Sequence, residues 1–341
     1  SVVRTGLGLK GVAQTRAVLS IRGEKIELSG RLNGRDASVS SIPVDAFAVN
    51  VSFDGSNLSL KELDLEAIGG HSLLDVEVPE GGPVRVVGAL DSLAAEPLLR
   101  WLFDYRGARL GARVSGPIDL SLPAGAPNLL SGTGDLVLIP DLAAGDPVSG
   151  RFPFEAKEGE ITMSSVQLEA PRTRVTLDGS VQADRRLSLQ VKLASDDLAV
   201  TDDLGVRLRV AFGTPDAQPL GATGQGVLQG QVSGTISSPV VSGRFQGKNV
   251  AYAGVFWGEV DWTGLASPDD LDTDRLTALR GASRAELTGK QRLGALGVDD
   301  AMDLDIKIED WPARDLLHIV DSALDVDSAI SGKVRLQGTR A

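Results

Sequence analysis

The sequence predicts an all-β protein, and three observations carry this prediction. Apolar and polar residues alternate along most of the chain, which is typical of strands with one apolar and one solvated face. Glycine-centred turn signals such as Asp54-Gly55, Glu158-Gly159 and Asp178-Gly179 recur roughly every 8–12 residues. Segments with helical periodicity are few, which disfavours a parallel α/β sheet and favours a long antiparallel meander.

The clearest alternating segments are residues 46–53, 118–122, 175–177, 187–193, 206–212 and 304–308. In residues 187–193, every second residue is apolar and the residues between are Ser188, Gln190 and Lys192. We expect the apolar positions of all these segments to share one sheet face. These positions are Phe47, Val49, Val51, Phe53, Ile118, Leu120, Val175, Leu177, Leu187, Leu189, Val191, Leu193, Val206, Leu208, Val210, Phe212, Leu304, Ile306 and Ile308.

Two segments break the alternation and predict short amphipathic helices, residues 93–105 and 311–322. Proline suits the first turn of a helix and disrupts its interior. We therefore expect the first helix to begin near Glu96, just before Pro97, and the second to carry Pro312 in its first turn behind Asp310. Trp101 and Trp311 would lie on these helices, either lining the apolar face or simply docking the helix.

A repeat connects these helices to the strands. Each helix follows a strand that ends in an acidic residue and precedes a strand that contains Ser-Gly, at Ser115-Gly116 and Ser331-Gly332. A degenerate copy runs from Leu193 to Ser233-Gly234. Recurrence of this kind is typical of stacked repeats. It predicts repeats over residues 1–90, 91–194 and 195–308, and the start of another over 309–341.

Composition excludes several functions. The net charge of −12 disfavours nucleic acid, which needs a basic surface, and also disfavours charge-driven binding to an anionic membrane. The absence of cysteine excludes disulfides, thiolate metal sites and cysteine nucleophiles. No window of about 20 apolar residues is present to span a membrane. Because Ser1 begins in mid-pattern, we expect the sequence to be a segment of a longer protein.

Few residues suggest chemistry, and we expect no catalytic residues, metal site or cofactor. His71 and His318 stand alone, so they are better interpreted as surface or satisfied side chains than as ligands or bases. The acidic stretches 196–203, 269–274 and 299–305 lack an EF-hand phrase and are better interpreted as solvated turns than as calcium sites. Residues 221–226 are rich in glycine, but a strand is expected after them where a dinucleotide fingerprint needs a helix.

A sheet with one apolar face must cover that face. A second sheet, closure into a barrel or a layer of helices would each do so, but the predicted helices are too few for the last. The remaining options are a sandwich, a barrel, or a curled sheet whose concave face holds something else. About twenty strands at ~4.8 Å would extend a trough of about 95 Å. Trp257 and Trp262 fit either the rim of such a trough or ordinary strand packing.

Residues 226–264 resemble the repeat of TamB and AsmA-like bacterial envelope proteins. That repeat contains two sequence motifs. Residues Gly226, Gly230, Gly234, Pro239 and Gly243 match the first motif, and Asn249, Tyr252 and Gly254 match the second. Residues 51–70 resemble another phrase of the family through Phe53, Gly55, Leu58, Leu60, Leu63, Gly69 and Gly70, and residues 152–179 match it more loosely.

The resemblance implies an elongated, taco-like antiparallel β-groove of stacked repeats, lined by the apolar positions named above. It implies a periplasmic protein, anchored in the inner membrane by a segment outside this sequence, that carries phospholipid acyl chains between the two membranes. It also implies a partner in the outer-membrane barrel TamA. The residues alone leave two alternatives open, an extended structural or interaction module without lipid and a carbohydrate-active β-protein with paired carboxylates.

Overall fold

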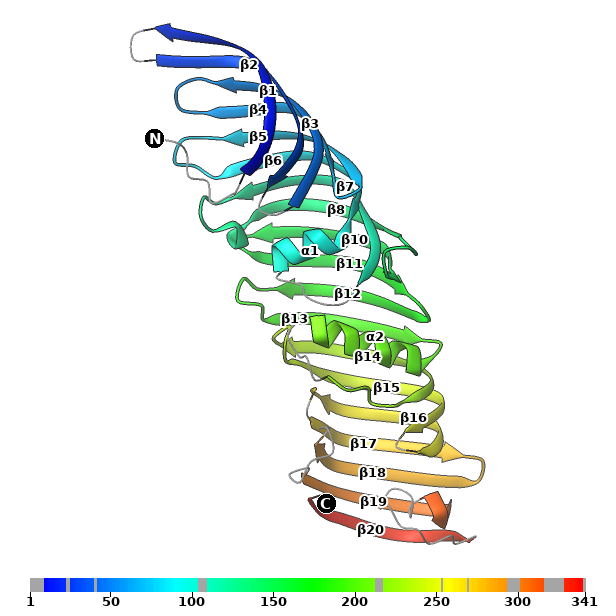
Figure 1. The fold of residues 1–341 in the computed structure, drawn as a ribbon. Helices are drawn as coiled ribbons and strands as arrows, with labels where there is room; N and C mark the ends of the chain where they lie inside the picture. Colours follow the sequence, from blue (N-terminus) through cyan, green and yellow to red (C-terminus); the bar gives the residue numbers. More distant parts are fainter. Residues whose placement is uncertain are drawn as a thin grey trace. The chain divides into compact units, whose positions relative to one another are not determined.

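A computed structural model describes residues 9–22, 25–39, 42–103, 109–211, 217–252, 254–268, 270–292, 301–315 and 328–339. These residues form 20 strands, two α-helices and one short 3-10 helix (Figure 1). The chain divides into two compact units. Unit 1 comprises Ser1–Leu168 with Ser180–Asp184, and unit 2 comprises Glu169–Gly179 with Arg185–Ala341.

Unit 1 is an antiparallel meander in which each strand pairs with the next, from β1 to β8 and then to β10. The short β9 pairs in parallel with β7. The elements are β1 (Leu9–Arg22), β2 (Lys25–Val39), β3 (Ile42–Phe53), β4 (Leu58–Ala67), β5 (Gly70–Val78), β6 (Val84–Ala94), α1 (Ala95–Phe103), β7 (Leu110–Leu122), η1 (Pro127–Leu129), β8 (Ser131–Pro140), β9 (Asp146–Pro147) and β10 (Ser149–Lys157). Strands β11 (Glu160–Ala170) and β12 (Thr173–Val181) contribute residues to both units.

Unit 2 repeats the same architecture, with antiparallel pairing from β13 to β20 in sequence order. Its elements are β13 (Leu187–Ser195), α2 (Leu198–Ala211), β14 (Thr223–Gly234), β15 (Pro239–Tyr252), β16 (Val255–Ala266), β17 (Asp270–Arg280), β18 (Ser283–Arg292), β19 (Ala301–Pro312) and β20 (Ala329–Thr339). The predicted all-β fold with an open antiparallel sheet and few short helices is confirmed.

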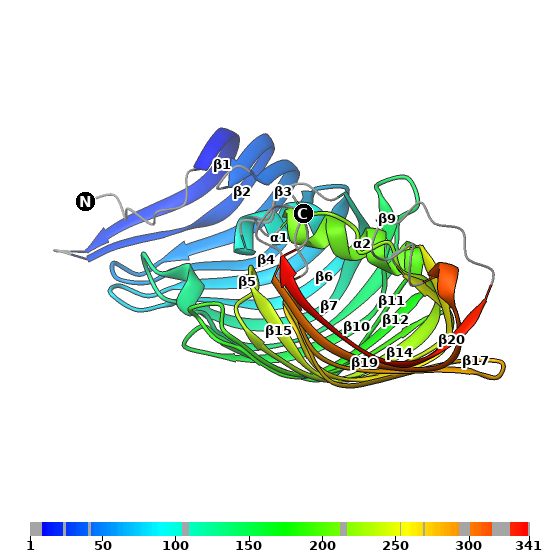
Figure 2. The same cartoon turned by 90° about the horizontal axis from the view of Figure 1, so that it is seen from below.

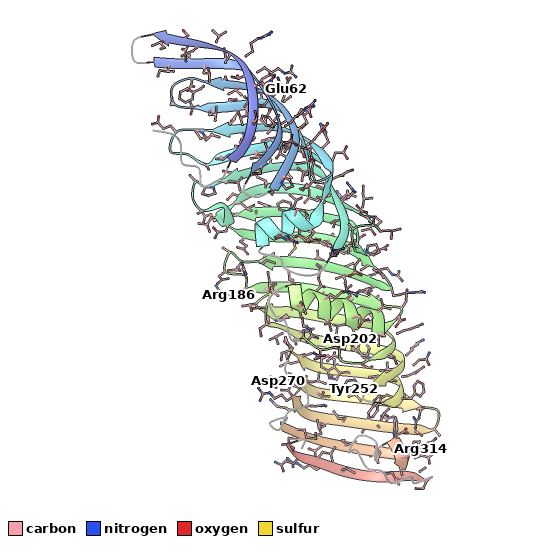
Figure 3. All side chains as sticks on the ribbon, in the orientation of Figure 1. Glu62, Arg186, Asp202, Tyr252, Asp270 and Arg314 are labelled. Atoms are coloured by element: carbon pink, nitrogen blue, oxygen red, sulfur yellow. The ribbon has the colours of Figure 1, made fainter. Side chains whose placement is uncertain are left out.

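Bulges bend the strands and give the sheet its curvature within each unit. The pairing of β4 with β5 shifts between Leu60 and Leu63, and the bulged Glu62 (labelled in Figure 3) has a φ of 52°. Its carboxylate accepts a hydrogen bond from Asn50 Nδ2 at 2.9 Å. Asn249 has the same φ at the shift between Gly247 and Val250 in β15. In each unit the helix lies on the concave side of the bent strands (Figure 2).

Both helices are insertions between strands that pair directly with each other. Helix α1 separates β6 from β7, and α2 separates β13 from β14. Residues 313–315 are helical and follow β19, which pairs with β20. The first predicted helix is therefore confirmed, beginning one residue before Glu96.

Two predictions about these insertions are wrong. Residues 206–211 belong to α2 and not to a strand, because the helix begins at Leu198 and continues through the alternating segment. Trp311 and Pro312 end β19 instead of opening a helix, because Trp311 is paired with Ile330 of β20. Phe212 and His318 lie outside the described residues.

Candidate functional site: the apolar faces of the two units

The apolar face of unit 1 is a set of rows that cross the strands. Residues opposite each other on antiparallel strands point to the same face, so the register identifies every member of a row. One row includes the predicted Val51 and Leu120, although they lie on β3 and β7. It reads Gly30, Val51, Leu60, Val76, Val86, Leu120, Gly132 and Ala156.

The predicted Phe47, Val49, Phe53 and Ile118 occupy neighbouring rows of the same face. Phe53 is opposite Leu58, and Phe47 is opposite Leu65. Ile118 is opposite Gly88 and Gly134. The structure therefore brings all six predicted residues of β3 and β7 onto one face of unit 1.

Unit 2 has an equivalent face, and its rows extend from β13 to β20. One contains the predicted Leu193 and Ile306 and reads Leu193, Leu228, Phe245, Trp262, Leu276, Leu287, Ile306 and Val334. The next contains Val191 and Leu304 and is rich in glycine: Val191, Gly230, Gly243, Gly264, Thr273, Gly289, Leu304 and Leu336. Leu189 belongs to a third row, and Ile308 to a fourth that begins at Ser195.

Exposure follows the predicted alternation. The apolar residues of β13 are half-buried, whereas Ser188, Gln190 and Lys192 between them are exposed. In β12, Val175 and Leu177 are half-buried and Thr176 and Asp178 are exposed. Leu187 follows the same pattern. By contrast, the predicted Leu208 lies on α2 with 38% of its surface exposed, and Val206 and Val210 are half-buried on the same helix. These three do not belong to a strand row.

Three phenylalanine rings lie flat against the apolar faces, each over a glycine of the neighbouring strand. A Cβ placed on Gly226 would come within 2.3 Å of a ring carbon of Phe245, which lies on the neighbouring strand. Phe47 covers Gly34 and Phe154 covers Gly134 at the same distance. The absence of a Cβ at these glycines therefore leaves room for the neighbouring ring, and the ring does not project from the apolar face.

Little protein covers the apolar faces. Among the described elements, strands contact mainly their partners in the ladder, while α1 packs on β7 and α2 on β14. Leu98 of α1 packs against Ala112 and Val114, and Leu198 of α2 packs against the buried cluster of unit 2. No second sheet faces either unit in the described part of the chain, so the sandwich alternative is wrong for it.

Helix α2 is fixed to its sheet through buried hydroxyl groups. The Asp197 carboxylate accepts a hydrogen bond from the Ala199 amide at 3.1 Å, which caps the helix. The Thr201 hydroxyl lies 2.6 Å from that of Thr173 and 2.7 Å from that of Ser195, and the latter two residues are buried. Such a cluster anchors the helix, and no histidine or carboxylate from the described part of the chain is hydrogen-bonded to these hydroxyls.

The tryptophans of unit 2 are part of its packing. Trp262 is buried on the apolar face and donates from Nε1 to Thr273 Oγ1 at 3.0 Å. The Trp257 and Trp311 rings lie 5.5 Å apart, and the Arg280 guanidinium lies 4.9 Å from the Trp311 ring. Trp101 lies on α1, as predicted.

The opposite face of the strands in each unit, the polar face, carries cross-strand ion pairs. Arg85 Nη2 lies 2.9 Å from Asp119 Oδ2, and Arg151 Nη2 lies 2.5 Å from Asp135 Oδ2. Hydrogen bonds from these arginines hold the pKa of both carboxyls below the usual range. Arg244 and Asp261 form the same arrangement in unit 2. Exposed pairs of this kind add little to stability, but they keep the polar face solvated.

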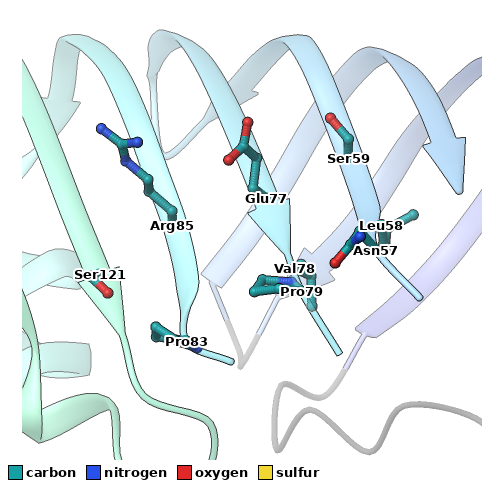
Figure 4. A pocket seen from close by; sticks show the side chains of 9 residues that line it. All are labelled: Asn57, Leu58, Ser59, Glu77, Val78, Pro79, Pro83, Arg85 and Ser121. Carbon is teal, nitrogen blue, oxygen red and sulfur yellow. The ribbon is translucent and has the colours of Figure 1, made fainter. Parts of the chain in front are cut away.

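A shallow pocket of about 400 Å³ lies at the ends of β4, β5 and β6 (Figure 4). Its polar wall is one row of the polar face: Ser59, Glu77, Arg85 and Ser121. Glu77 is paired with Lys61 and Arg85 with Asp119, so the charges of this wall are already neutralised. The pocket therefore does not offer a free charged group to a ligand.

His71 is exposed, and its Nε2 lies 2.6 Å from Asp64 Oδ1. Across the described ranges, no group of three histidine, aspartate or glutamate side chains is placed to hold a metal ion. Neither described helix has the length and apolar character needed to cross a membrane. Comparisons with protein-family models, with curated proteins and with solved structures found no match to this chain.

Proposed function

We propose that this chain holds the acyl chains of phospholipids on its apolar faces. The observation that carries the proposal is the extended apolar face, over which the described residues place no covering layer of protein. Soluble proteins rarely leave apolar patches of more than a few hundred Å² in water, so a face of this extent calls for an occupant.

The dimensions of the rows suit acyl chains. At ~4.8 Å per strand, a row extends about 38 Å across β1 to β10 in unit 1 and about 34 Å across β13 to β20 in unit 2. The acyl chains of one bilayer leaflet span about 15 Å, half of the hydrocarbon core. Each row is therefore about twice as long as one chain, and each methylene that leaves water contributes about 0.8 kcal/mol.

The chemistry of the faces also suits this cargo. Aliphatic side chains and flat-lying rings make up most of this surface, and such a surface selects for apolarity and not for a particular shape. The resemblance to TamB and AsmA-like proteins supports a periplasmic setting. In that setting the chain would be part of a bridge for phospholipids between the inner and outer membranes, with a TamA-like barrel as partner.

Native mass spectrometry of the purified protein, followed by lipid identification, tests the proposal. We expect bound phospholipid that remains through size-exclusion chromatography and exchanges with added lipid. A lipid-free protein whose apolar faces are protected from hydrogen exchange or occluded in a dimer would contradict it and favour a structural module. Selective retention of an oligosaccharide would favour the carbohydrate alternative.

A further inference from the structure

We infer that the hydroxyl of Ser72 donates a hydrogen bond to an ester carbonyl of the bound phospholipid. Ser72 lies in β5 on the apolar face of unit 1, in the row that contains Phe47, Leu65 and Leu90. It is 1% exposed, and its Oγ has no hydrogen-bond partner among the described residues. The inference rests on the proposed function and adds to it the chemical group of the lipid that the apolar face recognises.

Ser72 differs from the other buried polar residues of the apolar faces. Four polar side chains are buried among the described residues: Ser72, Thr173, Ser195 and Thr273. The hydroxyls of Thr173 and Ser195 bond to the threonine hydroxyl of α2, and Thr273 accepts a hydrogen bond from the buried indole of β16. A buried hydroxyl without a partner destabilises a fold, so packing within unit 1 gives no reason for a hydroxyl at Ser72.

The polar groups nearest to Ser72 on the neighbouring strands are already engaged or point away from it. Ser92 donates from Oγ to Asp91 Oδ1 at 2.8 Å, and its amide donates to Ser115 Oγ at 2.9 Å. The titratable side chains beside Ser72 in β4, β5 and β6 belong to the polar face: Asp64, Glu66, His71 and Asp91. An acceptor for the Ser72 hydroxyl is therefore left for a bound molecule to supply.

The other buried side-chain atoms that lack a hydrogen bond in the described part of the chain are less suited to meet a lipid. Trp311 Nε1 belongs to a ring that is packed against Trp257 and Arg280. Thr277 Oγ1 lies on the polar face, and Asp315 Oδ2 is ion-paired with Arg280 at 2.7 Å. Ser72, by contrast, lies on the apolar face with leucines on both adjacent strands.

An ester carbonyl is the acceptor that a diacyl phospholipid carries where its acyl chains begin. A hydrogen bond between a hydroxyl and a carbonyl is stronger in apolar surroundings than in water. From Ser72 the apolar face continues along β5 through Leu74, Val76 and Val78, a distance of about 20 Å. An acyl chain in one bilayer leaflet spans about 15 Å, so a chain whose ester lies at Ser72 stays on apolar side chains along its length.

The burial of Ser72 determines how a lipid reaches it. Leu65 and Leu90 flank it on the adjacent strands, with Cβ atoms about 5 Å away, and both are half-buried. Leucine side chains change rotamer without a change in the backbone, so these two can turn aside when a lipid enters. The hydroxyl is then shielded from water by the acyl chain that carries its acceptor.

Competition binding tests the inference, with delipidated protein and one equivalent of lipid per protein. The probes are a phosphatidylethanolamine with two palmitoyl ester chains and its analogue with two hexadecyl ether chains, whose ether oxygens are weaker acceptors. One neutral hydrogen bond corresponds to about fivefold in affinity. We therefore expect the wild type to bind the ester lipid about fivefold more tightly than the ether lipid, and Ser72→Ala to bind both equally.

Ser195→Ala is the matched control, because it removes a buried hydroxyl that is hydrogen-bonded within the chain. It should keep the preference for the ester lipid and lower the denaturant midpoint of the lipid-free protein. Ser72→Ala should leave that midpoint unchanged or raise it, because it removes an unpartnered hydroxyl. Infrared spectra of an isotope-labelled ester give a second readout, since the hydrogen bond lowers the carbonyl stretching frequency in the wild type and not in Ser72→Ala.

Three outcomes would overturn the inference: equal binding of both lipids by the wild type, a retained ester preference in Ser72→Ala, or an equal loss of that preference in Ser195→Ala. In each of them the protein still binds lipid, so the proposed function stands and Ser72 is a packing residue. A wild type that binds neither lipid contradicts the proposed function and the inference together.

Discussion

The substitution Leu189→Asp tests the register of the apolar face most directly. Leu189 is half-buried in β13, opposite Val232, and Val241 follows in the same row. A carboxylate there would face any bound acyl chain. The cost of an aspartate within hydrocarbon is about 2.5–3.5 kcal/mol, which corresponds to a loss of lipid affinity of about 60- to 400-fold.

Two matched variants separate charge from packing. Gln190→Asp places the same carboxylate on the polar face, where Gln190 is exposed and opposite Gln231, so lipid affinity should stay within about twofold. Leu189→Ala removes the side chain without adding charge. It should lower the free energy of unfolding by about 1–2 kcal/mol and retain most of the lipid, because the neighbouring rows remain apolar.

The assay is the competition of unlabelled phospholipid against a fluorescent phospholipid for the delipidated protein, with circular dichroism to confirm the fold of each variant. The reasoning is refuted if Leu189→Asp and Gln190→Asp weaken lipid binding equally. It is also refuted if Leu189→Ala weakens binding as much as Leu189→Asp, since loss of packing would then explain the whole effect.

Three further predictions concern the scaffold. Hydrogen bonds from Asn57 and Ser56 lower the pKa of Asp54 to about 2, so its contribution to the turn is complete above pH ~4 and is lost as the pH falls towards 2; a carboxyl titration by NMR with a midpoint near 4 would contradict this. Gly226→Ala should destabilise by about 1–3 kcal/mol through the ring of Phe245, whereas Gly332→Ala, which meets open space, should change denaturant stability little. Thr201→Val removes the hydroxyl; it should lower the free energy of unfolding by about 1 kcal/mol and speed hydrogen exchange in α2. Thr201→Ser keeps the hydroxyl and should do neither.

The strands could be predicted from sequence because period two is a local signal. The residues of 46–53 and 187–193 alternate without interruption, and each predicted apolar position lies on the apolar face of its unit. The spacing of Leu58, Leu60 and Leu63 also indicates the bulge at Glu62. Residues 60 and 63 of a regular strand would point to opposite faces, and the extra residue of a bulge puts both leucines on the same face.

The errors arose where contacts from distant residues decide the local structure. Residues 206–211 alternate like a strand, but capping by Asp197 and the hydroxyls of Thr173 and Ser195 fix α2 through the preceding residues. Trp311 extends β19 because Trp257 and Arg280, from two other strands, pack against its ring. Alternation within one segment contains no information about either partner.

The opposition of Arg16 and Arg31 could not be predicted from composition, because net charge averages over the whole chain. The two residues lie on different strands, and only the register of β1 with β2 places them opposite each other. A one-residue shift in that register would move Arg31 away from Arg16 and to the other face.

The ladder of sequence neighbours also has a consequence for how this chain folds. Within each unit, the described strands pair with the preceding and following strands, apart from the short β9. Most hairpins can therefore close over a short loop, and the connections are longer between β6 and β7, β13 and β14, and β19 and β20. The sheet can grow by adding one hairpin at a time. Because each described strand is held mainly by its neighbours in the ladder, local opening of single strand pairs should precede global unfolding, and hydrogen exchange measures this opening.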